Sequence, residues 1–301
     1  MKLVTFRTPD GTVRPGVLSD DQVVAIDLPD MRALFALGDE GLELARRATG
    51  PHWPLTEVRL LAPIAPKKFF HTAGNFREHE DESKRVGWSH EIAPWIVFFQ
   101  NVDAIVGPDE PVVYPPHLTR ELDYELELAV VLKRSGKHFD AAEAESYIGG
   151  YLIFNDVTAR DIQREEMRSG VFSFCKGIDT FCPIGPWIVT PDELGDPHDL
   201  DMQLRVNGEV RQRSHSSNMW VKIPEIIAHY SPMGYTAGDI LSTGTVSGVA
   251  AFQEDAESWY LRPGDVMECE IENIGILRNP VISWEEAYGE PPPAWGKEGD
   301  R

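Results

Sequence analysis

One stretch of the chain, residues 121–132 (ELDYELELAVVL), restricts the possible folds more than any other. Successive side chains of a strand point to opposite faces, so four acidic residues would share one face: Glu121, Asp123, Glu125 and Glu127. The alternation then gives way to an apolar run, which indicates a strand that enters the interior. The carboxylates either form the solvated face of an amphipathic strand, or they point inward and need a cation to offset their burial.

An inward-facing cluster of carboxylates favours a hard divalent ion. Mg²⁺ binds oxygen ligands at ~2.1 Å and keeps water molecules that substrate oxygens can replace. The sequence has no Cys and His cluster with zinc spacing, and no GxGxxG, GxxxxGK[ST], GxSxG or HExxH motif. Asp156 follows an apolar segment and is a third candidate ligand. Taken alone, an Asn-Asp pair before a helix is more often a turn or a helix N-cap than a metal site.

The charge balance excludes several kinds of partner. The chain has 49 acidic and 28 basic residues, and its formal charge of -21 repels phosphate backbones and anionic lipid. We therefore expect neither a nucleic acid nor a membrane partner, and an anionic substrate would need a local cation. Three cysteines without a CxxC pair favour a reducing compartment, and no apolar stretch reaches ~18 residues. The chain is predicted to be cytoplasmic.

The pattern of predicted elements indicates a β-rich α+β fold. Short strands are predicted over 2–27, an amphipathic helix over 31–48, and a Pro-rich junction over 51–66. We place a small N-terminal domain at 1–62, a main domain at 63–285 and a flexible tail at 286–301. The clearest helix of the main domain begins at Thr158, whose hydroxyl could cap it. Its predicted strands are 96–99, 122–132, 147–154, 204–210, 240–243 and 266–271.

Several segments of the main domain, taken in order, resemble the fumarylacetoacetate hydrolase family. They are Asp123-Tyr-Glu125-Leu-Glu127, Asn155-Asp156-Val-Thr-Ala-Arg160-Asp161-Ile-Gln163, Lys176 and Gly244-Thr245. The resemblance covers about residues 63–285. It implies a mixed β-sandwich roll with a small N-terminal β domain, usually assembled as a homodimer. It also implies that Mg²⁺ or Mn²⁺ is bound by Glu125, Glu127 and Asp156.

The resemblance implies roles for side chains around the ion. Lys176 and Thr245 would contact substrate, and Arg160 and Gln163 would lie on the helix face near the metal. Residues 74–82 resemble the lid helix of the family. On a helix His79 and Glu82 share a face, so that Glu82 could orient the imidazole. The alternatives are a solvent-facing histidine in a charged helix, and surface positions for Arg160 and Gln163.

One position departs from the pattern of the family. Many members carry a lysine after the apolar strand that follows the lid, whereas this chain has Gln100. A neutral amide there removes a positive charge near the substrate. Gln100 is kept as a candidate substrate-binding residue, and the change suggests a less acidic substrate or one held by Arg77 or Arg164.

The resemblance implies hydrolysis of a carbon–carbon bond in an acylpyruvate-like 1,3-dicarbonyl or 2-keto acid, in the catabolism of aromatic or sugar-derived acids. The ion would polarise the carbonyl, and the catalytic residues would be His79 and Glu82, which activate water, and Lys176, which binds the carboxylate or oxyanion. The same site could instead decarboxylate a 2-keto acid such as oxaloacetate, or catalyse keto–enol isomerisation. A third alternative is a non-catalytic protein that is stabilised by the metal.

Overall fold

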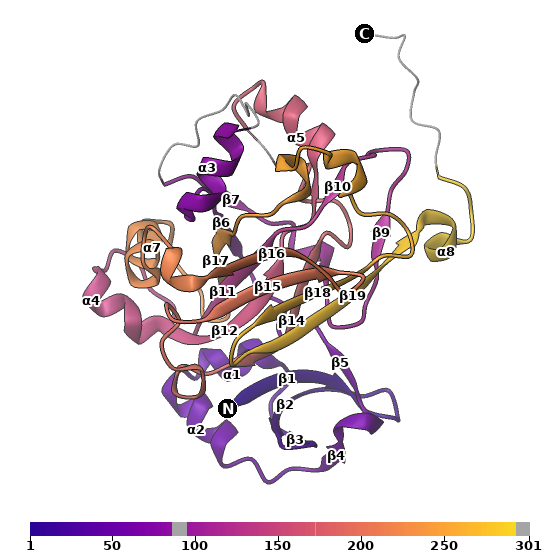
Figure 1. The fold of residues 1–301 in the computed structure, drawn as a ribbon. Helices are drawn as coiled ribbons and strands as arrows, with labels where there is room; N and C mark the ends of the chain where they lie inside the picture. The colour runs from indigo at the N-terminus through magenta and orange to yellow at the C-terminus, as the bar shows by residue number, and fades with distance from the viewer. Residues whose placement is uncertain (86–94, 172, 293–301) are drawn as a thin grey trace.

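A computed structural model describes residues 1–85, 95–171 and 173–292 (Figure 1). The larger sheet has twelve strands in the order β4-β3-β2-β1-β14-β12-β11-β17-β6-β7, with β5 paired to β1 and β8 paired to β14. Its strands are β1 (Lys2–Arg7), β2 (Val13–Ser19), β3 (Gln22–Ala25), β4 (His52–Pro54), β5 (Arg59–Leu61), β6 (Phe69–Thr72), β7 (Val97–Phe99), β8 (Ile105–Val106), β11 (Leu126–Leu132), β12 (Ile148–Asn155), β14 (Cys182–Val189) and β17 (Ile240–Thr245).

A second sheet of five strands packs against the larger one and has the order β16-β15-β18-β19-β9. Its strands are β9 (Val112–Tyr114), β15 (Asp201–Val206), β16 (Glu209–His215), β18 (Val266–Ile271) and β19 (Gly275–Ser283). The short strands β10 (Leu122–Asp123) and β13 (Thr158–Ala159) form a separate pair. The prediction of a β-rich α+β fold with two packed sheets is confirmed.

The helices are short and lie around the sheets (Figure 1). They are α1 (Met31–Ala36), α2 (Asp39–Arg46), α3 (Arg77–Arg85), α4 (Ala141–Ala144), α5 (Arg160–Met167), α6 (Pro191–Leu194), α7 (Ile223–Tyr230) and α8 (Trp284–Tyr288). The predicted helix over 31–48 is two helices, because Gly38 adopts a φ of 60° between them, which is a left-handed conformation that ends α1 and lets the chain turn into α2.

Strand β11 lies in the middle of the molecule and is buried on both faces. Leu126, Leu128, Val130 and Leu132 enter the core that the two sheets share. Ala129 and Val131 point the other way, into a core closed by Leu34 and Phe35 of α1. The apolar run after residue 127 is therefore an interior strand, as its composition predicts.

The continuous strand predicted over 122–132 is wrong at its centre. Tyr124 and Glu125 lie between β10 and β11. Side chains supply the hydrogen bonds there: Asn155 Oδ1 accepts from the backbone N–H of Glu125, and Gln212 Oε1 accepts from that of Leu126. Because side chains satisfy these N–H groups, the chain can leave the ladder and turn. The four acidic residues consequently do not share one face.

Three further details differ from the predicted elements. Thr158 does not cap a helix: it lies in β13, and α5 begins at Arg160. Strand β14 was not predicted, because Pro183, Gly185 and Pro186 interrupt its apolar pattern, yet it pairs with both β1 and β12. Residues up to Tyr288 of the predicted tail belong to α8, and 293–301 lie outside the described residues.

Candidate active site

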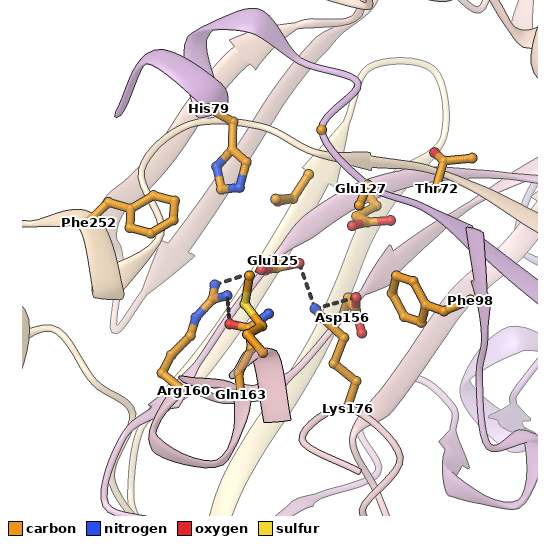
Figure 2. A pocket seen from close by; sticks show the side chains of 14 residues that line it. Thr72, His79, Phe98, Glu125, Glu127, Asp156, Arg160, Gln163, Lys176 and Phe252 are labelled. Atoms are coloured by element: carbon orange, nitrogen blue, oxygen red, sulfur yellow. Dashed lines mark hydrogen bonds and ion pairs between the residues drawn. The ribbon is translucent and has the colours of Figure 1, made fainter. Parts of the chain in front are cut away.

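Three acidic side chains converge at one end of the larger sheet. Strands β11 and β12 are antiparallel, and Leu126 pairs with Asn155, so the start of β11 lies beside the end of β12. This pairing brings Glu125 and Glu127 next to Asp156. Ligand atoms of the three residues all lie within 4.8 Å of one another, and all three residues are buried. They line a cavity that Figure 2 shows from close by.

Lys176 forms ion pairs with two of these carboxylates. Its Nζ lies 2.9 Å from Glu125 Oε2 and 2.6 Å from Asp156 Oδ2. It also donates to Thr158 Oγ1 at 2.8 Å, so the hydroxyl that was expected to cap a helix instead holds this ammonium. The Asp156 and Glu125 charges keep Lys176 protonated: although burial lowers its pKa, they raise it above its usual range.

Arg160 forms a second cationic contact, on the other side of Glu125. Its Nη2 lies 2.6 Å from Glu125 Oε1, and its Nε donates to Asp123 Oδ2 at 2.7 Å. Asp123 also accepts from the backbone N–H groups of Ala250 and Ala251 at 2.8 and 3.0 Å. Asp123 thus points to Arg160 and not to the metal candidates. Arg160 is buried, which excludes the surface interpretation.

The charges around the cavity fit a divalent cation. In their ionised forms, four buried carboxylates (Asp123, Glu125, Glu127 and Asp156) outnumber the two buried cations (Arg160 and Lys176) by two negative charges. Burial, together with the charges of Asp156 and Glu125, raises the pKa of Glu127 well above its ordinary value. Asp156 Oδ1 is buried without a hydrogen-bond partner among the described residues. An unpaired acceptor beside excess negative charge is what a divalent ion would satisfy.

His79 of the lid helix α3 faces this acidic cluster. Figure 2 shows the imidazole above Glu125 and beside Phe252, and only 7 % of the residue is exposed. Its Nδ1 has no hydrogen-bond partner among the described residues. Burial, the largest influence, lowers the pKa of His79 to about 4 together with the charges of Arg160 and Lys176 and against the opposing effect of Glu125. The side chain is therefore a neutral imidazole at physiological pH.

The predicted His79–Glu82 hydrogen bond is not formed in the described structure. Glu82 instead accepts from the backbone N–H of Gly248 at 2.8 Å and from Gln253 Nε2 at 3.4 Å. Helical spacing places the two residues on one side of α3. The loop after β17, however, offers Glu82 a backbone donor, and the carboxylate turns toward that loop. In this conformation Glu82 attaches the lid to the rim of the cavity and does not orient His79.

The pH dependence follows from the lowered pKa of His79. If neutral His79 is the base, we expect turnover to stay level from about pH 8 to about pH 5 and to fall as pH drops through about 4. The unfolded chain would bind the proton near 6.5, so this group also makes stability decrease as pH falls from 6.5 toward 4. A pH–rate profile of kcat/KM checks the predicted fall near pH 4. If kcat/KM of the wild type fell near pH 6.5, and His79→Gln showed no such fall, the lowered pKa of His79 would be contradicted.

The remaining predicted substrate residues are not all at the cavity. Gln163 and Thr245 line it, and Thr245 Oγ1 is held by the backbone oxygen of Leu126 at 3.1 Å. Gln100 is not among the lining residues, because its Oε1 turns back to accept from the backbone N–H of Asn101. The Gln100 amide is therefore not one of the groups that would contact a substrate in this cavity.

The two arginines considered as substitutes for that lysine also lie elsewhere. Arg77 lies over the ring of Trp220, and Arg164 pairs with Glu121 on the surface. Neither is among the described residues that line the cavity. The cations that do reach it are Arg160 and Lys176.

Some residues of the site were not predicted from the sequence. His71 lies in β6, and its Nδ1 is 3.4 Å from Asp156 Oδ2. The parallel pairing of β6 with β17 places it there, and that pairing joins segments some 170 residues apart. Phe98 of β7 and Phe252 of the 3₁₀ helix Ala250–Phe252 also line the cavity. A polar residue inside the apolar run Phe69–Thr72 is the signal that could have indicated His71.

Two family models match the chain. Residues 68–282 match the model described as fumarylacetoacetate (FAA) hydrolase, C-terminal, and residues 1–63 match the Rv2993c-like N-terminal model. The chain belongs to the fumarylacetoacetate hydrolase family. This bears out the resemblance that the acidic and Asn-Asp segments predicted, and the fold is that of the solved members.

Three relatives illustrate the range of the family. Human mitochondrial oxaloacetate tautomerase FAHD2A is 39 % identical over 94 % of this chain and 92 % of its own length. The fumarylacetoacetate hydrolase of Exiguobacterium antarcticum has a TM-score of 0.81 at 34 % identity, over 94 % and 99 % of the two chains. Maleylpyruvate hydrolase of Sphingobium sp. SYK-6, solved with manganese(II) and pyruvate, has a TM-score of 0.75 at 28 % identity, over the same shares.

These comparisons also bear on the cellular location. The curated human relatives are mitochondrial proteins, so a cytoplasmic location stays a prediction. In the part of the chain that the structure describes, no helix is long and apolar enough to cross a membrane.

Proposed function

We propose that this chain is a divalent-ion-dependent keto–enol tautomerase for a small 2-oxo dicarboxylic acid of the oxaloacetate class. The observation that carries the proposal is His79, a buried neutral imidazole that faces the acidic cluster. Among the described residues its Nδ1 has no hydrogen-bond partner, and Glu82 contacts Gly248 and not the imidazole. Proton transfer to and from carbon needs such a base and no attacking water. The extensive match to the human oxaloacetate tautomerase supports the same activity.

The proposed reaction moves one proton from carbon 3 of the acid to its carbonyl oxygen. His79 takes the proton, and the electrons of the broken C–H bond form the carbon–carbon double bond. The imidazolium then returns a proton to the oxygen of the former carbonyl, which restores neutral His79. Its lowered pKa favours this return, because the charged imidazole is costly in a buried site.

The other residues would hold the reactants. Glu125, Glu127 and Asp156 would hold the ion, which when bound acts as a Lewis acid on the substrate carbonyl. Lys176 and Arg160 would donate hydrogen bonds to the carboxylates of the substrate, and the ion would supply the positive charge that an anionic substrate needs in a chain of net charge -21. Phe252 and Phe98 narrow the cavity and exclude water from it.

Hydrolysis of a carbon–carbon bond is the second candidate function. Glu82 lies three residues after His79 on α3, and burial, the largest influence on it, raises its pKa. A rotation of this side chain away from Gly248 would be needed to form the water-activating pair. The likeness to maleylpyruvate hydrolase and to fumarylacetoacetate hydrolase also supports this candidate.

A substrate panel distinguishes the candidates. The protein is stripped with a chelator, and enol-oxaloacetate, an acylpyruvate and maleylpyruvate are assayed with and without Mg²⁺ or Mn²⁺. We expect metal-restored loss of enol absorbance without release of pyruvate. Cleavage of an acylpyruvate without tautomerisation would favour the hydrolase, and pyruvate from oxaloacetate would favour the decarboxylase. If the metal changes only thermal stability, the proposal of an enzyme on these substrates fails.

A further inference from the structure

The segment between α5 and Lys176 is held by one carboxylate that the proposed reaction does not use. Glu166, near the end of α5, accepts from three successive backbone N–H groups. Phe174 and Cys175 donate at 2.9 Å each, and Ser173 donates at 3.2 Å. Glu166 is half-buried, and although burial raises its pKa, the N–H groups of this loop lower it below its usual value. The carboxylate is therefore charged at neutral pH, which strengthens these hydrogen bonds.

Among the described residues, the other backbone hydrogen bonds of residues 173–175 join them to Lys176, Gly177 and Ala159. The side chains of Val171 and Phe174 are 61 % and 50 % exposed, so they contribute little apolar packing. Cys175 is buried, and its carbonyl accepts from the backbone N–H of Ala159 at 2.9 Å. The clamp made by Glu166 thus supplies a large part of the polar contacts that hold residues 173–175.

The residue that follows this segment is Lys176, whose Nζ must reach both Glu125 and Asp156. The same helix that carries Glu166 carries Arg160. A single carboxylate therefore fixes the loop of one site cation to the helix of the other. A displacement of about 1 Å can cost a well-placed group about 100-fold in rate, so this connection matters for the reaction.

We propose that Glu166 is a positioning residue that sets Lys176 in the active site by clamping residues 173–175 to α5. Its effect on turnover rests on the proposed function, in which Lys176 holds the substrate. Its effect on the placement of Lys176 is independent of the proposed function and can be measured without any substrate.

The test combines amine labelling with kinetics. The full-length protein is treated with an acetylating N-hydroxysuccinimide ester, and modification of each lysine is measured by peptide mapping. Glu166→Ala and Glu166→Gln are compared with Glu165→Ala, a neighbour on α5 whose side chain is 72 % exposed and pairs with Arg168. Lys133, which pairs with Asp39 far from α5, serves as an internal reference for an intact fold.

We expect Lys176 to be protected in the wild type and in Glu165→Ala, and its labelling to rise at least about 10-fold in Glu166→Ala with that of Lys133 unchanged. Glu166→Gln keeps an accepting oxygen without the charge, so labelling of Lys176 in this variant should lie between that of the wild type and that of Glu166→Ala. Equal protection of Lys176 in all variants would overturn the proposal. Increased labelling of Lys133 would show that Glu166→Ala does not fold. In that case the labelling of Lys176 in Glu166→Gln is compared with that in Glu165→Ala, and equal protection would again overturn the proposal.

Kinetics then separate this proposal from the proposed function. We expect Glu166→Ala to raise KM about 10- to 100-fold for the tautomerised acid, with a smaller change in kcat and no change in Glu165→Ala. If Lys176→Ala leaves turnover of oxaloacetate unaffected, the role of Lys176 in the proposed function fails, whereas the labelling result for Glu166 stands. If Lys176→Ala is impaired and Glu166→Ala matches the wild type in labelling and KM, the clamp is wrong.

Discussion

Replacing Glu125 with alanine should lower turnover by about 10³-fold or more and destabilise the metal-free protein by about 3–5 kcal/mol. Glu125 is the one carboxylate that contacts both site cations, Arg160 and Lys176. Its removal deprives the buried Arg160 Nη2 and Lys176 Nζ of the carboxylate that both contact, and it also removes a ligand for the ion. Urea unfolding measures the first effect, and calorimetric titration with Mn²⁺ measures the second.

Glu121→Ala is the matched control for this variant. It removes a carboxylate from the same acidic stretch, but its partner Arg164 is 47 % exposed at the surface. A pair of this kind contributes about 0–1 kcal/mol, so we expect nearly wild-type stability and Mn²⁺ affinity. If Glu125→Ala bound Mn²⁺ as the wild type does, the assignment of the metal ligands would be wrong.

His79→Ala should lower kcat for tautomerisation by about 10²- to 10⁴-fold, the usual contribution of a general base. His79 does not belong to the group of candidate metal ligands whose atoms lie within 4.8 Å of one another, so Mn²⁺ affinity in the same titration should stay unchanged. Stopped-flow measurement of the loss of enol absorbance gives kcat. Wild-type turnover by His79→Ala would exclude the imidazole as the base.

Glu82→Ala provides the comparison that separates the two candidate reactions. Glu82 contacts Gly248 and not His79. Its removal should therefore lower kcat for tautomerisation only by loosening α3 over the cavity, and by much less than His79→Ala does. For hydrolysis, both members of a water-activating pair are needed, and the two variants should be about equally impaired. A loss of equal size in both variants during tautomerisation would contradict the proposed function.

The sequence predicted the part of the site that depends on local pattern and on the order of motifs. Alternation around residue 125 and the apolar run after it indicated carboxylates at the entrance of an interior strand, and antiparallel pairing of β11 with β12 places Asp156 beside them. The homodimer and the role of each site residue stay predictions. The pattern failed at Tyr124 and Glu125, where the side chains of Asn155 and Gln212 replace strand hydrogen bonds.

The sequence by itself determined the β-rich fold, because strand periodicity acts over a few residues, and the family, because the order of its motifs can be read without knowledge of contacts. The cluster of three acids was implied by the resemblance to that family. Only the tertiary structure decided that Asp123 serves Arg160, that Glu82 turns to Gly248, that Gln100 lies away from the cavity and that Glu166 holds the loop before Lys176. Each of these contacts depends on which hydrogen-bond donor or charge lies nearest to the side chain in space. That donor or charge often belongs to a residue far away in the sequence.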